Sequence, residues 1–340
     1  MVGLLLFNQS SLPAQDWERV VDLRGTWKFS PGDNPERAEL NFDDHEWDDI
    51  FVPAAWEDEG FPGYDGYGWY RKHFRLDMVE DEKNLYVNLG TIDDVDEVYF
   101  NGYFIGFSGS FPPDYFTAYN VERVYRLPVE YFRISGENVL SVRVFDEQQA
   151  GGIVRGRVGI YKNKNDLDLL LTLEGSWKFA LRDDLDRKRI EYDDSNWKAV
   201  MVPAAWETQG FRNYDGFAWY RKKFIIPERL RGEYLVLILG KIDDIDEVYL
   251  NGRLIGKTGS FKDISWKTPS TEWLEIRAYE IEPEDIRYGE TNTLAVRVYD
   301  GLVQGGIYEG PIGIARYQDY KAWSRKIKNP NKSLFDMIFK

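Results

Sequence analysis

A segment that occurs twice in the chain carries the residue types best suited to ligand chemistry. The first copy, "YDGYGWYR", spans residues 64–71, and the second, "YDGFAWYR", spans residues 214–221. Aromatic rings can stack on the apolar face of a sugar, and carboxylate and guanidinium groups can bind its hydroxyls. The candidate carbohydrate-binding residues are therefore Tyr64, Asp65, Trp69 and Arg71 in the first copy and Tyr214, Asp215, Trp219 and Arg221 in the second.

The same residues can instead belong to the protein interior. Side chains alternate between the two faces of an extended strand, so Trp69, Arg71 and His73 share one face. A buried arginine needs an anionic partner, and Asp146 and Glu57 are the expected partners of Arg71. The chemistry alone leaves both interpretations open, a sugar platform and a structural arginine, in both copies.

Acidic residues gather in another repeated segment, "TIDDVDEVYFNG" at residues 91–102 and "KIDDIDEVYLNG" at residues 241–252. Glycoside hydrolysis needs two carboxylates that face each other across about 5 Å or about 6.5–9.5 Å. These acids instead run along one strand into a hairpin. We therefore predict a turn and strand-edge role, in which aspartates accept backbone N–H bonds. A structural calcium site stays open, although the EF-hand spacing is absent, and no other cofactor is predicted.

The composition excludes several classes of function. The chain has no cysteine and two histidines, so disulfide scaffolds, thiolate metal sites and histidine metal clusters are ruled out. The net charge of −15 argues against a nucleic-acid partner, because phosphate binding needs a basic face. Aromatic residues make up 16% of the chain, which suits both β-sheet proteins and sugar-stacking surfaces.

Almost the whole chain consists of two copies of one sequence pattern. "GTWKF" at residues 25–29 matches "GSWKF" at 175–179, an offset of 150 (175 − 25), and "GGI" at 151–153 matches 305–307, an offset of 154 (305 − 151). A repeat of this length is a domain and not a short solenoid unit. We therefore predict two domains, at residues 16–162 and 163–317.

Each copy has the pattern of a β-sheet protein. "NVLSVRVFD" at residues 138–146 alternates apolar and other side chains, and Asn101-Gly102 and Asn251-Gly252 each separate two apolar runs, as in two-residue hairpins. No long amphipathic helix interrupts either copy. The predicted fold class is all-β, with two tandem jelly-roll β-sandwiches.

The two ends of the chain differ from the repeats. Residues 1–15 hold a short apolar run and then small residues, which resembles the remnant of a signal peptide and predicts a secreted or periplasmic protein. Nothing in the chain is long enough to span a membrane. Residues 318–340 form a basic tail, for which a frayed end is favoured over an element that docks on a protein partner.

The ordered set of motifs resembles a known domain. "VPAAWE", "YDG-x-x-WYRK", "IDD-x-DEVY-x-NG", "RVFD" or "RVYD" and "GGI" follow one another in both copies. This order resembles the sugar-binding jelly roll of family-2 glycoside hydrolases, the β-galactosidase and β-glucuronidase group. It is also similar to the accessory module of sialate O-acetylesterases.

The resemblance implies a galactose-binding-like β-sandwich whose "YDG" loop, with Asp65 and Asp215, borders a sugar pocket. The catalytic acids of the hydrolases lie on a (β/α)₈ barrel, and the esterases carry serine and histidine on a separate domain; neither fits beside two sandwiches here. We therefore expect a non-catalytic carbohydrate-binding protein. The alternatives are an accessory or truncated glycoside hydrolase and a structural or sensory protein-interaction module.

Overall fold

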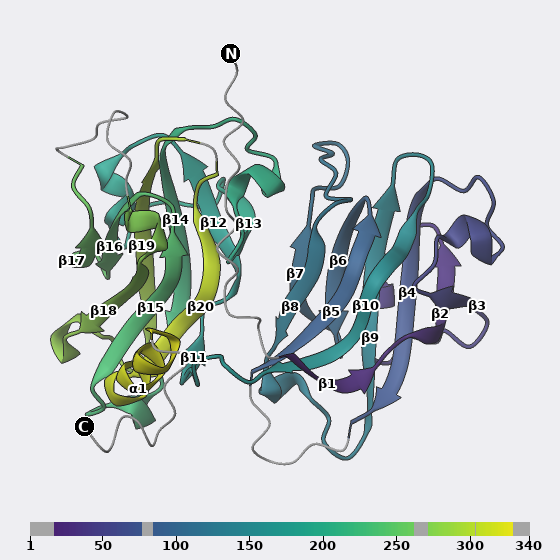
Figure 1. Ribbon diagram of the computed structural model, residues 1–340, viewed down its shortest axis with the longest axis horizontal. Coiled ribbons are helices and arrows are strands. Elements are labelled where there is room, and N and C mark those ends of the chain that lie inside the picture. The colour runs from purple at the N-terminus through teal and green to yellow at the C-terminus, as the bar shows by residue number, and fades with distance from the viewer. Residues whose placement is uncertain (1–16, 77–83, 262–270, 303, 329–340) are drawn as a thin grey trace.

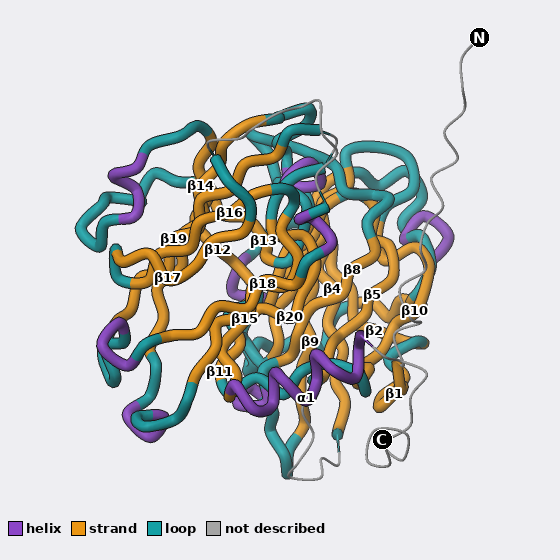
Figure 2. Tube along the Cα trace, turned by 60° about the vertical axis from the view of Figure 1, so that its left-hand side comes forward, coloured by secondary structure: helices purple, strands orange, loops and turns teal. Residues whose placement is uncertain are grey.

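The computed structural model describes residues 17–76, 84–261, 271–302 and 304–328. Strands make up most of this trace, and its helices are short (Figure 2), so the all-β prediction is confirmed. None of the helices in the described ranges is long and apolar enough to cross a membrane. The predicted signal-peptide remnant and the last part of the basic tail lie outside the described residues.

The first half of the chain forms two antiparallel sheets. A four-stranded sheet has the order β1-β10-β5-β8, and a six-stranded sheet has the order β3-β2-β4-β9-β6-β7. The strands are β1 (Trp17–Asp22), β2 (Gly25–Pro31), β3 (Asp48–Val52), β4 (Gly66–Arg75), β5 (Leu85–Asp93), β6 (Val95–Phe100), β7 (Tyr103–Ser108), β8 (Glu122–Leu127), β9 (Glu137–Asp146) and β10 (Gly152–Asn163).

The second half has the same strand order, with every strand number raised by ten: β11-β20-β15-β18 and β13-β12-β14-β19-β16-β17. Its strands are β11 (Leu171–Thr172), β12 (Gly175–Leu181), β13 (Lys198–Val202), β14 (Gly216–Ile225), β15 (Leu235–Ile242), β16 (Ile245–Leu250), β17 (Arg253–Thr258), β18 (Ile276–Ile281), β19 (Thr291–Asp300) and β20 (Ile307–Arg316). The duplicated sequence therefore gives a duplicated topology. Figure 1 shows the two halves side by side, the first in purple to teal and the second in green to yellow.

Short helices occupy the connections. The 3₁₀-helices are η1 (Pro35–Ala38), η2 (Trp56–Glu59), η3 (Val129–Tyr131), η4 (Leu185–Lys188), η5 (Trp206–Gln209), η6 (Glu228–Leu230), η7 (Glu272–Leu274) and η8 (Pro283–Asp285), and the α-helix is α1 (Tyr317–Lys328). The start of the predicted frayed tail is thus helical. Tyr320 and Trp323 of α1 pack against the four-stranded sheet of the second half, and Trp323 Nε1 donates to the carbonyl of Asn165 over 2.8 Å.

One hydrophobic core lies between the two sheets of each half. In the first half, Trp27, Phe29 and Val142 of the six-stranded sheet meet Val87 and Ile160 of the four-stranded sheet. The residues in equivalent positions form the core of the second half. Burial of these large apolar side chains is the main force that holds the sheets together.

The local predictions for turns and alternation are confirmed. Asn101 and Gly102 have φ of 52° and 85° between β6 and β7, as a type I′ hairpin turn requires. Along β9, Leu140, Val142 and Val144 all face the core. Register follows from this pattern, because a slip by one residue would turn these side chains away from the core.

Candidate functional site

The tryptophans of the repeated "WYRK" segment lie in the interior of the protein. Trp69 and Trp219 expose none of their surface. Their indole Nε1 atoms donate to Asp33 and Asp183, each over 3.2 Å. An indole with no exposed face cannot stack on a sugar, so the structure corrects the predicted sugar platform at both positions.

Arg71 is a structural arginine in the first half. Its side chain is fully buried, and its Nε lies 2.6 Å from Oδ2 of Asp44. Its Nη1 donates to the carbonyl of Arg37 over 2.6 Å and to the hydroxyl of Ser141 over 2.9 Å. The sequence analysis predicts Asp146 or Glu57 as the acidic partner, and the structure corrects this prediction to Asp44. Arg71 ties the loop after η1 to the six-stranded sheet.

Arg221 has the same role in the second half. It is 1% exposed, and its Nε lies 2.7 Å from Oδ2 of Asp194. Its Nη1 donates to the carbonyls of Arg187 and Arg189, the latter over 3.0 Å. Both predicted sugar-binding arginines therefore hold loops in place.

The tyrosines and aspartates of the "YDG" loops have different positions. The Tyr64 hydroxyl accepts from the amide of Gly32 over 2.9 Å and donates to the carbonyl of Tyr67 over 2.6 Å, so it braces the loop. Tyr214 makes the corresponding bonds to Arg182 and Phe217. The carboxylates of Asp65 and Asp215 are exposed to solvent.

Two of the predicted strand-edge acids meet a third acid in the first half. Asp93, Asp94 and Asp146 each offer one carboxylate oxygen, and these three oxygens lie within 4.8 Å of one another. Asp93 ends β5 and Asp146 ends β9, and Gly66, the residue after Asp65, pairs with Asp146 across the sheet. The "YDG" loop therefore lies beside this carboxylate triad.

The second half repeats the triad with Asp243, Asp244 and Asp300, whose carboxylate oxygens also lie within 4.8 Å of one another. Here the predicted residue Asp215 is close enough to act electrostatically on Asp300 and on Glu207. We call each triad with its neighbouring "YDG" loop an acidic cluster.

Burial and mutual repulsion change the acidity of the triads. Burial, together with contacts to Asp94, raises the pKa of Asp93 to about 7, and burial together with repulsion from Asp94 raises that of Asp146 to about 8. Burial likewise raises the pKa of Asp243 and Asp300 to about 7. Both effects favour the neutral form of these carboxyl groups over the charged form.

Asp94 differs from its neighbours. Burial opposes ionisation, but hydrogen bonds from the hydroxyls of Thr117 and Tyr115 and from the amide of Glu147 hold the pKa of Asp94 below its usual value. The Thr117 hydroxyl lies 2.5 Å from Oδ1, and the Glu147 amide lies 3.0 Å from Oδ2. The charged form is therefore favoured at Asp94 in the first triad. The hydrogen bond that Asp94 accepts from the Glu147 amide fits the predicted turn role.

A glycine loop follows β9 in the first half and β19 in the second. The amide of Gly151 donates to the carboxylate of Glu57 over 3.1 Å, and the amide of Gly305 donates to Glu207 over the same distance. A Cβ on Gly151 would lie 2.3 Å from the ring of Trp56. Only glycine therefore fits where this loop crosses the tryptophan.

The other predicted acids serve the fold. Asp96 and Arg123 form a fully buried ion pair with 2.6 Å between Oδ1 and Nε, and Glu97 pairs with Arg143 over 3.0 Å. The second half has the same two pairs. Asp146 and Asp300 had a usable signal in the sequence, since "RVFD" and "RVYD" each come shortly before a "GGI".

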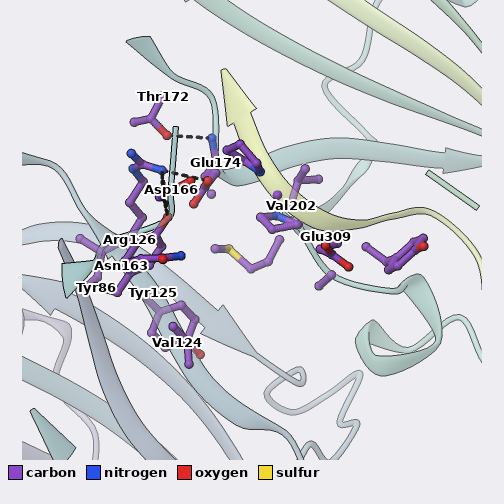
Figure 3. A pocket seen from close by; sticks show the side chains of 18 of the residues that line it. Tyr86, Val124, Tyr125, Arg126, Asn163, Asp166, Thr172, Glu174, Val202 and Glu309 are labelled. Atoms are coloured by element: carbon purple, nitrogen blue, oxygen red, sulfur yellow. Dashed lines mark hydrogen bonds and ion pairs between the residues drawn. The ribbon is translucent and has the colours of Figure 1, made fainter. Parts of the chain in front are cut away.

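A cleft of about 1190 Å³ lies between the two halves (Figure 3). On one side of it, Arg126 of β8 lies 3.2 Å from Asp166 and 3.1 Å from Glu174, and it donates to the Tyr86 hydroxyl over 2.9 Å. Because Glu174 belongs to the second half and Arg126 to the first, this network joins the halves. Val202 and Glu309 line the cleft farther along.

Comparison with known proteins finds similarity to family-2 glycoside hydrolases over part of the chain. A stretch of 157 residues is 28% identical to a β-galactosidase of Bacteroides ovatus and covers 42% of this chain and 17% of that enzyme. A 93-residue stretch is 28% identical to a β-galactosidase of Thermoanaerobacter pseudethanolicus and covers 26% of this chain and 12% of that enzyme.

Among solved structures, a family-2 glycosyl hydrolase of Bacteroides cellulosilyticus aligns with 84% of this chain and 32% of its own, with a TM-score of 0.37 and 17% identity. No protein-family model matches the chain. The chain spans less than a fifth of the two β-galactosidases that it matches. The similarity to these segments supports a carbohydrate-related domain.

Proposed function

We propose that this chain is a non-catalytic carbohydrate-binding protein. In this proposal, each half is a galactose-binding-like jelly-roll β-sandwich, and its acidic cluster binds a sugar. The observation that carries the proposal is the position of the "YDG" loop beside a carboxylate triad in both halves, in a chain whose sequence relatives include β-galactosidases and β-glucuronidases. The resemblance to sialate O-acetylesterases remains a prediction.

The chemistry of the acidic cluster suits hydroxyl groups. A sugar hydroxyl can donate a hydrogen bond to a carboxylate oxygen, and Asp65 and Asp215 offer such oxygens. Asp65 and Asp215 are exposed, so a ligand from solvent can contact them more readily than the half-buried Asp93 and Asp243. Two weak sites on one chain would together bind a multivalent glycan more tightly than either site alone.

A glycan array tests this proposal. We expect the wild-type protein to bind a defined group of glycans, and the Asp65→Ala/Asp215→Ala double variant to lose them while its melting temperature stays the same. Asp49→Ala, at an exposed ion pair with Lys28, is the matched control and should bind as the wild type does. No glycan bound by the wild type, or full binding by the double variant, would refute the proposal.

The second candidate is an accessory part of a glycoside hydrolase. It is favoured by the fact that the matched relatives are whole enzymes, of which this chain resembles short segments. Nitrophenyl β-galactoside and β-glucuronide assays on the purified chain distinguish the two proposals. Turnover that Asp65→Ala or Asp215→Ala removes would favour a catalytic role, and no turnover by the wild type would favour binding.

A protein partner and an exported location remain proposals as well. Trp323 on α1 is anchored to the second half, whereas the exposed Lys321 and Arg325 offer basic groups to a partner. Co-purification that is lost on deletion of residues 317–340 would support the protein-interaction alternative. Fractionation of cells that make the full chain would show whether it is secreted or periplasmic.

A further inference from the structure

The carboxylate triads have a feature that hydrogen bonding within the protein does not explain. Asp146 and Asp300 expose none of their surface, and the Oδ2 atom of each has no hydrogen-bond partner. Their Oδ1 atoms accept from backbone amides, of Gln148 over 3.3 Å and Leu302 over 3.0 Å. A buried carboxylate oxygen without a partner is costly, and the same cost occurs at equivalent positions in both halves.

The surroundings of these oxygen atoms are acidic. The charged side chains that act most strongly on Asp300 are Asp244, Asp215 and Glu207. In the first half, the cation that acts on Asp93 is Arg123, whose Nε is already bonded to Asp96 over 2.6 Å. The protein therefore brings acidic groups together, and the charged neighbours named here include no free cation.

The spacing of the oxygen atoms fits one ion. Calcium lies about 2.3–2.6 Å from each oxygen ligand, so two ligands of one ion are at most about 5 Å apart. In each triad, every residue offers one carboxylate oxygen, and these three oxygens lie within 4.8 Å of one another. All three are hard oxygen donors, and neither histidine nor cysteine is among them, which disfavours zinc and copper.

We propose that each carboxylate triad binds one calcium ion, which fills the place facing Oδ2 of Asp146 in the first half and Oδ2 of Asp300 in the second. Calcium accepts irregular sets of oxygen ligands, whereas magnesium usually keeps several of its waters. Each ion would join the end of β5 or β15 to the end of β9 or β19. This proposal does not depend on carbohydrate binding, and either one can fail alone.

Terbium luminescence tests the proposal, because terbium takes calcium sites and is sensitised by nearby aromatic rings such as Trp56 and Trp206. We expect wild-type protein that has been stripped with chelator to bind two terbium ions per chain and to release them to calcium but not to an equal concentration of magnesium. Asp146→Asn should bind one ion, and Asp146→Asn/Asp300→Asn should bind at least about 100-fold more weakly at both sites.

Two further variants keep the test decisive. Asp93→Asn changes a half-buried ligand, so it is used if Asp146→Asn fails to fold, and it should also remove one ion. Asp114→Asn changes an exposed acid outside the triads and should bind two ions. No terbium binding by the wild type at millimolar concentration, or two ions bound by Asp146→Asn/Asp300→Asn, would overturn the proposal.

Discussion

Arg71 and Asp44 form a buried ion pair in which the guanidinium Nε lies 2.6 Å from the carboxylate Oδ2. Asp44 belongs to the loop between η1 and β3, and Arg71 belongs to β4, so the pair fixes a long loop on the sheet. His73 lies on the same strand face and reaches the same Oδ2 over 2.8 Å. The repeated "WYRK" therefore belongs to the frame of the protein, and its arginine acts on stability.

We expect Arg71→Ala to lower the free energy of unfolding by about 3–5 kcal/mol, because it leaves Asp44 partly buried without its main partner. Arg221→Ala should do the same in the second half. Chemical denaturation monitored by tryptophan fluorescence measures both. Arg24→Ala, at an exposed pair with Asp22, should leave the stability nearly unchanged. An Arg71→Ala variant that keeps its stability but loses glycan binding would instead support the interpretation of Arg71 as part of a sugar platform.

The environment of Asp44 also predicts how the free energy of unfolding depends on pH. Burial would raise its pKa, but hydrogen bonds from His73 and Arg71 hold the pKa of Asp44 below the usual 3.8. Since the folded-state pKa is the lower one, the contribution of Asp44 is fully present above about pH 4 and is lost as the pH falls through the folded-state pKa.

The difference in unfolding free energy between wild type and Asp44→Asn should therefore be large at pH 7 and should shrink below pH 4. Urea titrations at a series of pH values measure this difference. Asp49→Asn, at the exposed pair with Lys28, serves as the control and should differ little from wild type at any pH. A difference that stays constant down to pH 2 would contradict the role given to Asp44.

Gly151→Ala should destabilise the first half by about 1–3 kcal/mol, because the new methyl group would lie 2.3 Å from the buried ring of Trp56. The loop follows Asp146 of the acidic cluster, so glycan binding in the first half should weaken as well. Gly136→Ala is the matched control, since its nearest neighbour is the flexible Arg133 side chain at 3.4 Å. Equal melting temperatures for the two variants would show that the loop adapts.

Much of the fold could be predicted from the sequence, because its signals are local. The alternation along β9 and the Asn101-Gly102 turn specify strands and hairpins without reference to distant residues. The duplicated motifs predict two similar halves, and the strand order is the same in both halves. The helix in the C-terminal tail was harder to predict from the sequence, because α1 packs through contacts of Trp323 with a distant part of the chain.

The site was less predictable, because its members meet only through the topology. Asp93 and Asp146 are 53 positions apart (146 − 93), and their meeting depends on how β5 and β9 end. A tryptophan and an arginine such as Trp69 and Arg71 are equally suited to a sugar platform and to a buried structural role. Their burial depends on the loop that carries Asp44, and no local pattern shows that this loop covers them.

Arg126 should hold the two halves together. Arg126→Met removes the partner of the buried Asp166 and Glu174, so we expect a loss of about 3–5 kcal/mol and the separation of one thermal transition into two. Differential scanning calorimetry measures both effects. Arg157→Met, at an exposed pair with Glu122, is the control and should melt as the wild type does. An unchanged single transition for Arg126→Met would show that the halves are joined elsewhere.

The most direct test of the central claim is isothermal titration calorimetry with the best glycan from the array. The account predicts two sites on the wild type, one site on Asp65→Ala and one on Asp215→Ala, and none on the double variant, all with unchanged melting temperatures. Arg71→Lys, where it folds, should keep both sites. Two sites on the double variant, or loss of binding in a folded Arg71→Lys variant, would contradict the claim that the acidic clusters bind the sugar.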